Sequence, residues 1–261
     1  MKFVDAHVHL SDPEYSNKII QLIEDARSSN VVALISNSMN LETSYASLQL
    51  AKENPNLIYA ALGIHPWNSQ NLEPNEIEET INLIIREANA GRIVAIGEVG
   101  LDPQYAKNEE QRKQQHKTFS EMLSVAEKTS LPTIVHSRGS SEEAMSLLPS
   151  YHVSKVLFHW FVRPIELLRD IVDRGCYISE GPPSVFSKGI KEVIKRIPLS
   201  NLLTETDGPV QFFGPFRNKI TTPSFIPLVV DAIAQIKEVE KTEVADQIVQ
   251  NFTKFFEITI V

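Results

Sequence analysis

The sequence predicts a single α/β domain over residues 1–261, folded as a (β/α)8 or TIM barrel. Eight apolar runs of four to eight residues alternate with longer segments of helical periodicity, the pattern of repeated βα units around a parallel sheet. The length of 261 residues suits one barrel of about 250 residues. No linker-like stretch rich in Gly, Ser or Pro divides the chain, so we expect one domain.

The apolar runs give the predicted strands in chain order. They lie at about 2–7, 31–36, 58–64, 92–98, 131–136, 155–159, 175–180 and 200–206. Apolar runs that alternate with helical segments are typical of parallel strands. Eight such strands predict a sheet that closes on itself.

The segments between and after these strands predict helices. They lie at about 15–29, 41–54, 73–90, 106–129, 141–149, 164–173, 187–197, 223–237 and 242–257. Pro74 lies in the first turn of the third helix with Gly91 after it, and Pro164 opens the sixth. The last helix carries three phenylalanines that we expect to close the barrel core: Phe252, Phe255 and Phe256.

Composition narrows the class of protein. The net charge of −8 disfavours wrapping around long DNA, which requires many Lys and Arg on phosphates, although a small basic rim could guide a strand end. The N-terminus has no apolar signal-peptide core, and no uninterrupted apolar run approaches about 18 residues, so we expect no membrane partner. The single cysteine, Cys176, excludes an internal disulfide and favours the cytoplasm. We infer no obligate protein partner.

Metal-capable side chains close several of the predicted strands. His7 and His9 are two apart in the first strand and so point to one face. One histidine in an apolar run is usually a core residue, but the recurrence at successive strand ends favours a common pocket. A closed parallel barrel places its chemistry at the carboxyl ends of its strands. The other side chains there are His65, Glu98, His136, His159 and Asp207.

These side chains predict a dinuclear metal site. Without His65, they comprise four imidazoles and two carboxylates, which are too many for one catalytic zinc, because such a zinc usually takes three protein ligands. Glu98 could bridge two ions about 3.5–4 Å apart, and a water between them becomes hydroxide near neutral pH. That chemistry suits hydrolysis of a phosphodiester. The ligand types are compatible with Zn²⁺, Mg²⁺ or Mn²⁺.

Five motifs in this order resemble the TatD family of metal-dependent hydrolases, a branch of the amidohydrolase-like barrels. The likeness runs almost from end to end. The motifs are Asp5-Ala6-His7-Val8-His9-Leu10, Gly63-Ile64-His65-Pro66, Ala95-Ile96-Gly97-Glu98-Val99-Gly100-Leu101-Asp102, His136-Ser137-Arg138, and Glu205-Thr206-Asp207-Gly208-Pro209.

The resemblance implies roles for individual residues. It implies a first metal on His7, His9, Glu98 and Asp207, and a second on Glu98, His136 and His159. Asp207 would also orient or deprotonate the attacking water. His65 is implied as a pocket residue near phosphate, and Arg138 as a phosphate contact, which its planar fork suits. The implied activity is that of a TatD-type deoxyribonuclease, which cleaves DNA phosphodiester bonds with a metal-bound hydroxide.

The chain departs from the family pattern at the predicted substrate mouth. His159 is followed by Trp160 and Arg163, where the family commonly has a cysteine and a turn glycine. Glu180 stands where the family usually has an apolar residue, so it either contacts substrate, braces a metal-bound water or is a solvated loop acid. Trp67, after the third strand, is either an aromatic wall for a base or loop packing, as is the cluster at 212–217.

Two further carboxylates are expected to support the metal ligands. Glu205 is two residues before Asp207 and shares its face of the strand, and an isolated buried carboxylate is costly, so we expect it to brace a liganding histidine. Asp102 is interpreted in the same way, with a helix cap as its alternative.

Two other functions fit the same residues. The first is a dinuclear ester or amide hydrolase acting on aminoacyl-tRNA or a small cyclic substrate, because paired metals also polarise carbonyls. The second is a barrel that has lost catalysis and serves as a binding protein, which the intact ligand set disfavours.

Overall fold

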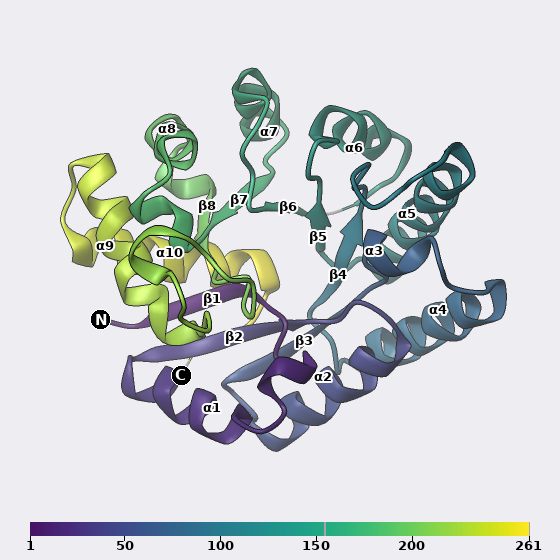
Figure 1. The fold of residues 1–261 in the computed structure, drawn as a ribbon, viewed down its shortest axis with the longest axis horizontal. Helices are drawn as coiled ribbons and strands as arrows, with labels where there is room; N and C mark the ends of the chain where they lie inside the picture. The colour runs from purple at the N-terminus through teal and green to yellow at the C-terminus, as the bar shows by residue number, and fades with distance from the viewer. Residues whose placement is uncertain (154, 261) are drawn as a thin grey trace.

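The computed structural model describes residues 1–153 and 155–260 and confirms the predicted (β/α)8 barrel. All eight strands pair in parallel in the order β1 to β8, and Figure 1 shows them at the centre of the molecule. Their bounds are β1 Phe3–Val8, β2 Val31–Asn37, β3 Ile58–Leu62, β4 Ala95–Gly100, β5 Thr133–His136, β6 Val156–His159, β7 Tyr177–Glu180 and β8 Leu202–Thr204.

The helices surround the strands in chain order (Figure 1). The helices cover the outer face of the sheet, so the strands are buried on both faces and lack an alternating polar pattern. The bounds of the helices are α1 Ile19–Ser28, α2 Leu41–Glu53, α3 Pro66–Ser69, α4 Pro74–Asn89, α5 Glu109–Thr129, α6 Ser141–Leu147, α7 Leu168–Asp173, α8 Lys188–Arg196, α9 Ile226–Lys237 and α10 Lys241–Phe256.

Two local features differ from the sequence prediction. β8 has three residues, because the chain before it forms a 3₁₀ turn at Leu199–Asn201. The short helix α3 was missed: its four residues are too few for helical periodicity to register. Its start is fixed by Pro66 and by His65, whose Nδ1 accepts a hydrogen bond from the Trp67 backbone N–H at 3.0 Å.

The barrel is closed between its first and last strands by Asp5. One carboxylate oxygen of Asp5 accepts hydrogen bonds from the backbone N–H groups of His7 and Thr206, each at 3.1 Å. The other accepts from the Thr206 hydroxyl. The Asp207 N–H also donates to the His7 carbonyl at 2.9 Å. β1 and the chain after β8 are therefore held in register at the point where three of the predicted ligands lie.

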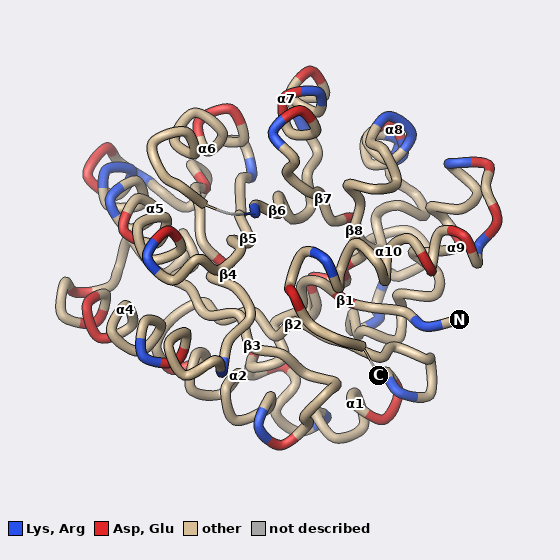
Figure 2. The backbone as a smooth tube through the Cα atoms, turned by 180° about the vertical axis from the view of Figure 1, so that it is seen from behind, with Lys and Arg blue, Asp and Glu red and all other residues tan. Residues whose placement is uncertain are grey.

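The outer helices carry many charged residues. Lys and Arg are interspersed with Asp and Glu along the outer helices (Figure 2). None of the helices in the described ranges is both long and apolar enough to cross a membrane.

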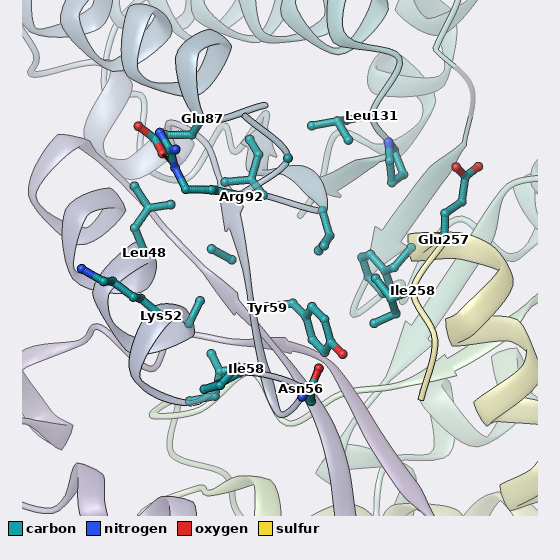
Figure 3. Close-up of a pocket in the computed structure, with 18 of the residues that line it drawn as sticks. Leu48, Lys52, Asn56, Ile58, Tyr59, Glu87, Arg92, Leu131, Glu257 and Ile258 are labelled. Atoms are coloured by element: carbon teal, nitrogen blue, oxygen red, sulfur yellow. Dashed lines mark hydrogen bonds and ion pairs between the residues drawn. The ribbon is translucent and has the colours of Figure 1, made fainter. Parts of the chain in front are cut away.

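A cavity of about 1020 Å³ opens at the amino-terminal end of the barrel. Figure 3 shows Tyr59, Arg92, Leu131 and Ile258 around it, from the start of β3, from the segments that lead into β4 and β5, and from the chain after α10. Among the described residues, none of the predicted site residues lines it. This cavity is therefore separate from the predicted chemistry.

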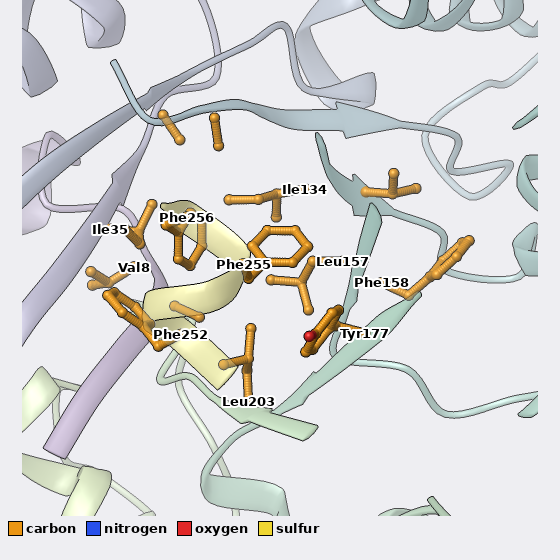
Figure 4. Packing of buried hydrophobic residues seen from close by; sticks show 14 of the residues in the cluster. Val8, Ile35, Ile134, Leu157, Phe158, Tyr177, Leu203, Phe252, Phe255 and Phe256 are labelled. Atoms are coloured by element: carbon orange, nitrogen blue, oxygen red, sulfur yellow. The ribbon is translucent and has the colours of Figure 1, made fainter. Parts of the chain in front are cut away.

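Helix α10 fills the barrel core next to this cavity. Figure 4 shows Phe252, Phe255 and Phe256 on α10 among strand residues such as Leu157 and Leu203. The ring of Phe255 lies 5.2 Å from the ring of Tyr177 in β7, edge to face. All three phenylalanines are buried, so their predicted core role is confirmed.

Replacement of Phe255 tests how much this packing stabilises the fold. Phe255→Ala removes a fully buried ring and is expected to lower the free energy of unfolding by about 3–5 kcal/mol, measured by urea titration. Phe213→Ala is the matched control, because Phe213 is 75% exposed and its loss should change stability by less than about 0.5 kcal/mol. Equal effects of the two substitutions would contradict the packing role of α10.

Candidate metal centre

The structure brings all six predicted ligands together at the carboxyl ends of the strands. His7 lies in β1 and His9 just after it, and Glu98 lies in β4. His136 and His159 are the last residues of β5 and β6, and Asp207 follows β8 by three residues. All but His136 are buried, and the His136 side chain is 13% exposed.

The first pair of imidazoles comes from β1. Nε2 of His7 and Nε2 of His9 lie 3.2 Å apart. Oε2 of Glu98 is 3.2 Å from the first nitrogen and 3.1 Å from the second. Oδ1 of Asp207 is 3.5 Å from both. Two nitrogens and two carboxylate oxygens thus converge on one point.

The second pair of imidazoles comes from β5 and β6. Nδ1 of His136 and Nε2 of His159 lie 3.1 Å apart, and Oε1 of Glu98 is 2.7 Å from each. The two oxygens of Glu98 therefore face different imidazole pairs.

This arrangement fits cations. The facing nitrogens lie 3.1–3.2 Å apart in the two imidazole pairs, a distance that requires either a shared proton or a metal ion between them. Oε2 of Glu98 is buried and has no hydrogen-bond donor in the described part of the chain. Mixed imidazole and carboxylate ligands suit Zn²⁺ and other divalent transition ions. The residues present could therefore hold metal at both pairs.

Neighbouring groups orient several of these rings through their other nitrogen. Nδ1 of His9 lies 3.1 Å from the Asn37 carbonyl oxygen, and Nε2 of His136 lies 2.8 Å from Oδ2 of Asp102. Such contacts fix the ring and its tautomer. Asp102 therefore contacts a predicted ligand directly, rather than capping α5, whose N-cap is Asn108.

Glu205 lies next to the outer nitrogen of His159. Oε1 of Glu205 is 3.7 Å from His159 Nδ1, and Oε2 accepts a hydrogen bond from the Ser179 hydroxyl. The ring of His159 in turn stacks on that of His7 at 4.0 Å. Glu205 therefore lies beside the second imidazole pair.

The site keeps its carboxylates ionised. Burial alone would raise the pKa of Glu98, but the surrounding histidines, His65 foremost, outweigh burial and hold it well below its usual range. Burial opposes ionisation of Asp207 as well, and the hydrogen bond from His9 lowers its pKa. Burial would lower the pKa of His9, yet Asp207 and Glu98 raise it to about 10. The carboxylates thus require positive charge between them.

A cavity of about 800 Å³ lies over the site and is lined by five of the six ligands, all except the fully buried His7. Arg138 lines it, and its Nε donates to Oδ2 of Asp102 at 2.8 Å. This bond fixes the guanidinium at the edge of the cavity. Trp160 and Arg163 also line the cavity, as does His65, whose Nε2 lies 3.4 Å from Oε1 of Glu98.

Glu180 is not brought to the substrate cavity. Its side chain is fully buried and does not line the cavity in the described structure, so neither a solvated loop acid nor a direct substrate contact fits its position. Ser179 points to Glu205, and the next residue of a strand points to the opposite face, so Glu180 faces the helix layer. Burial, with the nearby charge of Glu205, raises its pKa well above its usual range.

Two cavity residues hold an unusual backbone conformation. Asp207 has φ of 51° and Trp160 has φ of 41°, in the left-handed region that non-glycine residues rarely adopt. Such strain persists only where surrounding contacts enforce it and is frequent at functional sites. For Asp207 those contacts include the hydrogen bond from its N–H to the His7 carbonyl.

Some residues of the cavity were missed from the sequence. Tyr105 and Asp12 line it, and the available signal was their position shortly after the fourth and first strands. Phe212, which belongs to the cluster at 212–217 named from the sequence, does not line the cavity in the described structure, but its ring lies 5.3 Å from that of Trp160. Two histidines lie elsewhere: His116 pairs with Glu143 and His152 with Glu127.

Fold and site together define a metal-dependent hydrolase of the barrel class. A family model described as TatD related DNase matches residues 4–257. The chain belongs to the TatD family, as its five motifs indicated.

Three relatives illustrate the similarity. The chain is 32% identical to an uncharacterised metal-dependent hydrolase of Methanocaldococcus jannaschii, covering 98% of this chain and 97% of the relative. It is 32% identical to the Homo sapiens protein named deoxyribonuclease TATDN3, and the match covers 97% of this chain and 94% of that protein. The crystal structure of a TatD homologue from Escherichia coli superposes with a TM-score of 0.88 at 25% identity and covers 98% of both chains.

Asp102 offers a test of how the second imidazole pair is supported. Asp102→Asn removes the charge beside His136 and is expected to weaken binding of Zn²⁺ or Mn²⁺ by roughly 10- to 100-fold, measured by isothermal titration calorimetry. Glu143→Gln is the matched control, because it alters a histidine–carboxylate pair outside the cavity. Equal metal affinity of both variants would contradict a supporting role for Asp102.

Glu180 predicts a pH dependence of stability. Its pKa is raised in the folded protein, so above about pH 4.5 the unfolded chain loses this proton first and the free energy of unfolding falls as pH rises. The slope from one group is at most about 1.4 kcal/mol per pH unit. Glu180→Gln should reduce this slope in urea titrations from pH 5 to 8.5 and stabilise the protein at the upper end. The control Glu79→Gln, at an exposed position, should retain the wild-type slope. An unchanged slope in Glu180→Gln would contradict a raised pKa of Glu180 in the folded protein.

Proposed function

We propose that this protein is a deoxyribonuclease that hydrolyses DNA phosphodiester bonds. The observation that carries the proposal is the position of Glu98, with one oxygen toward each of two imidazole pairs, beneath a cavity that also holds Arg138. Paired cations suit in-line displacement at phosphorus, and a guanidinium suits phosphate oxygens. The name of the human relative supports DNA as the substrate.

The proposed cofactors are two divalent metal ions, Zn²⁺, Mg²⁺ or Mn²⁺. His7, His9, Asp207 and Glu98 would hold the first, and His136, His159 and Glu98 the second. When bound, the ions would activate water as a nucleophile and polarise the phosphoryl group.

Three side chains would assist the reaction. Asp207 would accept the proton of the attacking water, because its carboxylate stays ionised beside His9. Nδ1 of His65 accepts the Trp67 N–H, so the neutral ring carries its proton on Nε2 and can donate it to Glu98 or to a phosphate oxygen. Arg138, held by Asp102, would orient the phosphate.

The mouth of the cavity would bind the flanking part of the strand. Trp160 and Arg163 line it and provide an aromatic surface and a cation. The net charge of −8 favours contact with a strand end over binding along a duplex. We place the activity in the cytoplasm, in keeping with the single cysteine.

Single-stranded DNA labelled separately at each end tests the proposal. Metal-stripped protein resupplied with Mg²⁺, Mn²⁺ or Zn²⁺ should shorten it, and the labels report the polarity. Asp207→Asn should lower the rate by roughly 100- to 10,000-fold, because a neutral amide is a poor ligand and no base. Asp173→Asn is the matched control, since that aspartate is exposed on α7 and should keep wild-type activity.

Circular dichroism must show that Asp207→Asn is folded for the comparison to hold. Full activity of the folded Asp207→Asn protein would overturn the mechanism. Intact DNA under every ion would overturn the deoxyribonuclease assignment and favour a carbonyl substrate.

A further inference from the structure

We propose that the indole of Trp67 is a stacking platform for the base that adjoins the scissile phosphate. This inference rests on the proposed function, since it describes how that site would bind a base of its substrate. It assigns a positioning role to Trp67 and to Tyr105, which stacks against it.

Trp67 presents an aromatic surface to the metal cavity. It lies in α3, lines the cavity and is 56% exposed, whereas large aromatic side chains usually bury most of their surface. It is two residues from His65, so its backbone lies within roughly 7 Å of that of His65. Nε2 of His65 is 3.4 Å from Glu98. The indole therefore stands close to the proposed reaction centre.

The indole is stacked against a second residue of the cavity, Tyr105. The ring of Tyr105 stacks on it with centroids 5.1 Å apart and an interplanar angle of 28°. Tyr105 in turn contacts the His65 ring at 6.0 Å, and Cζ of Arg138 lies 4.7 Å from the Tyr105 centroid. These contacts fix the orientation of Trp67, which remains 56% exposed at the edge of the cavity.

The neighbours of the indole suggest a nucleotide as occupant. Arg138 is anchored by Asp102 and contacts Tyr105, so a cation suited to phosphate lies beside the aromatic stack. A flat ring on an open aromatic face, with a phosphate on an adjacent guanidinium, matches one nucleotide. Stacking is tolerant of base identity, because every base has an aromatic face. The platform should therefore position DNA without reading its sequence.

The test combines Trp67 variants with oligonucleotides that lack one base. Trp67→Ala should raise KM for a DNA oligonucleotide by roughly 5- to 100-fold with little change in kcat, and Trp67→Phe should raise it less. An abasic site next to the cleaved bond should raise the KM of wild type. It should leave the KM of Trp67→Ala unchanged, because this variant has no indole on which a base could stack. Phe213→Ala is the matched control, because Phe213 is 75% exposed and does not line the cavity in the described structure.

A second readout does not depend on turnover. The chain has two tryptophans, so Trp160→Phe leaves Trp67 as the only indole. In metal-free protein, an oligothymidylate should quench this fluorescence more strongly than an abasic oligonucleotide of the same length. With Trp67 and Trp160 both replaced by Phe the chain has no indole, and this variant measures the background signal.

The outcomes separate the inference from the proposed function. Suppose that wild type cleaves DNA, that Trp67→Ala has an unchanged KM, and that the abasic site raises KM equally in both proteins. Trp67 is then not a stacking platform. If wild type cleaves no DNA, the proposed function fails, and fluorescence alone decides the platform. Base-dependent quenching of Trp67 then supports it, and equal quenching by both oligonucleotides overturns it.

Discussion

The carboxylate of Glu98 is the interaction on which the arrangement of the site depends. One oxygen faces His7 and His9, and the other faces His136 and His159. A buried carboxylate without compensating partners is costly, so three other strands must end where their side chains meet β4. A parallel barrel achieves this, because all its strands point the same way and converge at one rim. Fold and charge balance thus impose the same geometry.

The two ends of the barrel differ in composition and in role. At the amino-terminal end, the phenylalanines of α10 fill the interior with apolar rings. At the carboxyl end, the interior is polar and the loops carry the groups suited to substrate. Packing at one end can therefore support buried, partly strained residues such as Asp207 at the other.

Most of the fold and the ligand set could be predicted from local patterns. Period-two spacing placed His7 and His9 on one face, and the rule of strand ends gathered the remaining ligands. Inter-strand register was not available from sequence, so nothing indicated whether Ser179 or Glu180 faces the barrel interior. The pairing of imidazole nitrogens around Glu98 was equally hidden, because it depends on ring rotation. Tyr105 was missed since its role arises from contact with Trp67, which is distant in sequence.

The Asp5 contact has a consequence for folding. Asp5 and Thr206 are 201 positions apart in the chain, so their hydrogen bonds close a very large loop. Contacts of such long sequence separation form late, after local βα units have assembled. His7 and Asp207 flank this closure, whereas His136 and His159 lie on neighbouring strands. During folding, the β5–β6 half of the site can therefore assemble early, while the half that joins β1 to β8 waits for the ring to close.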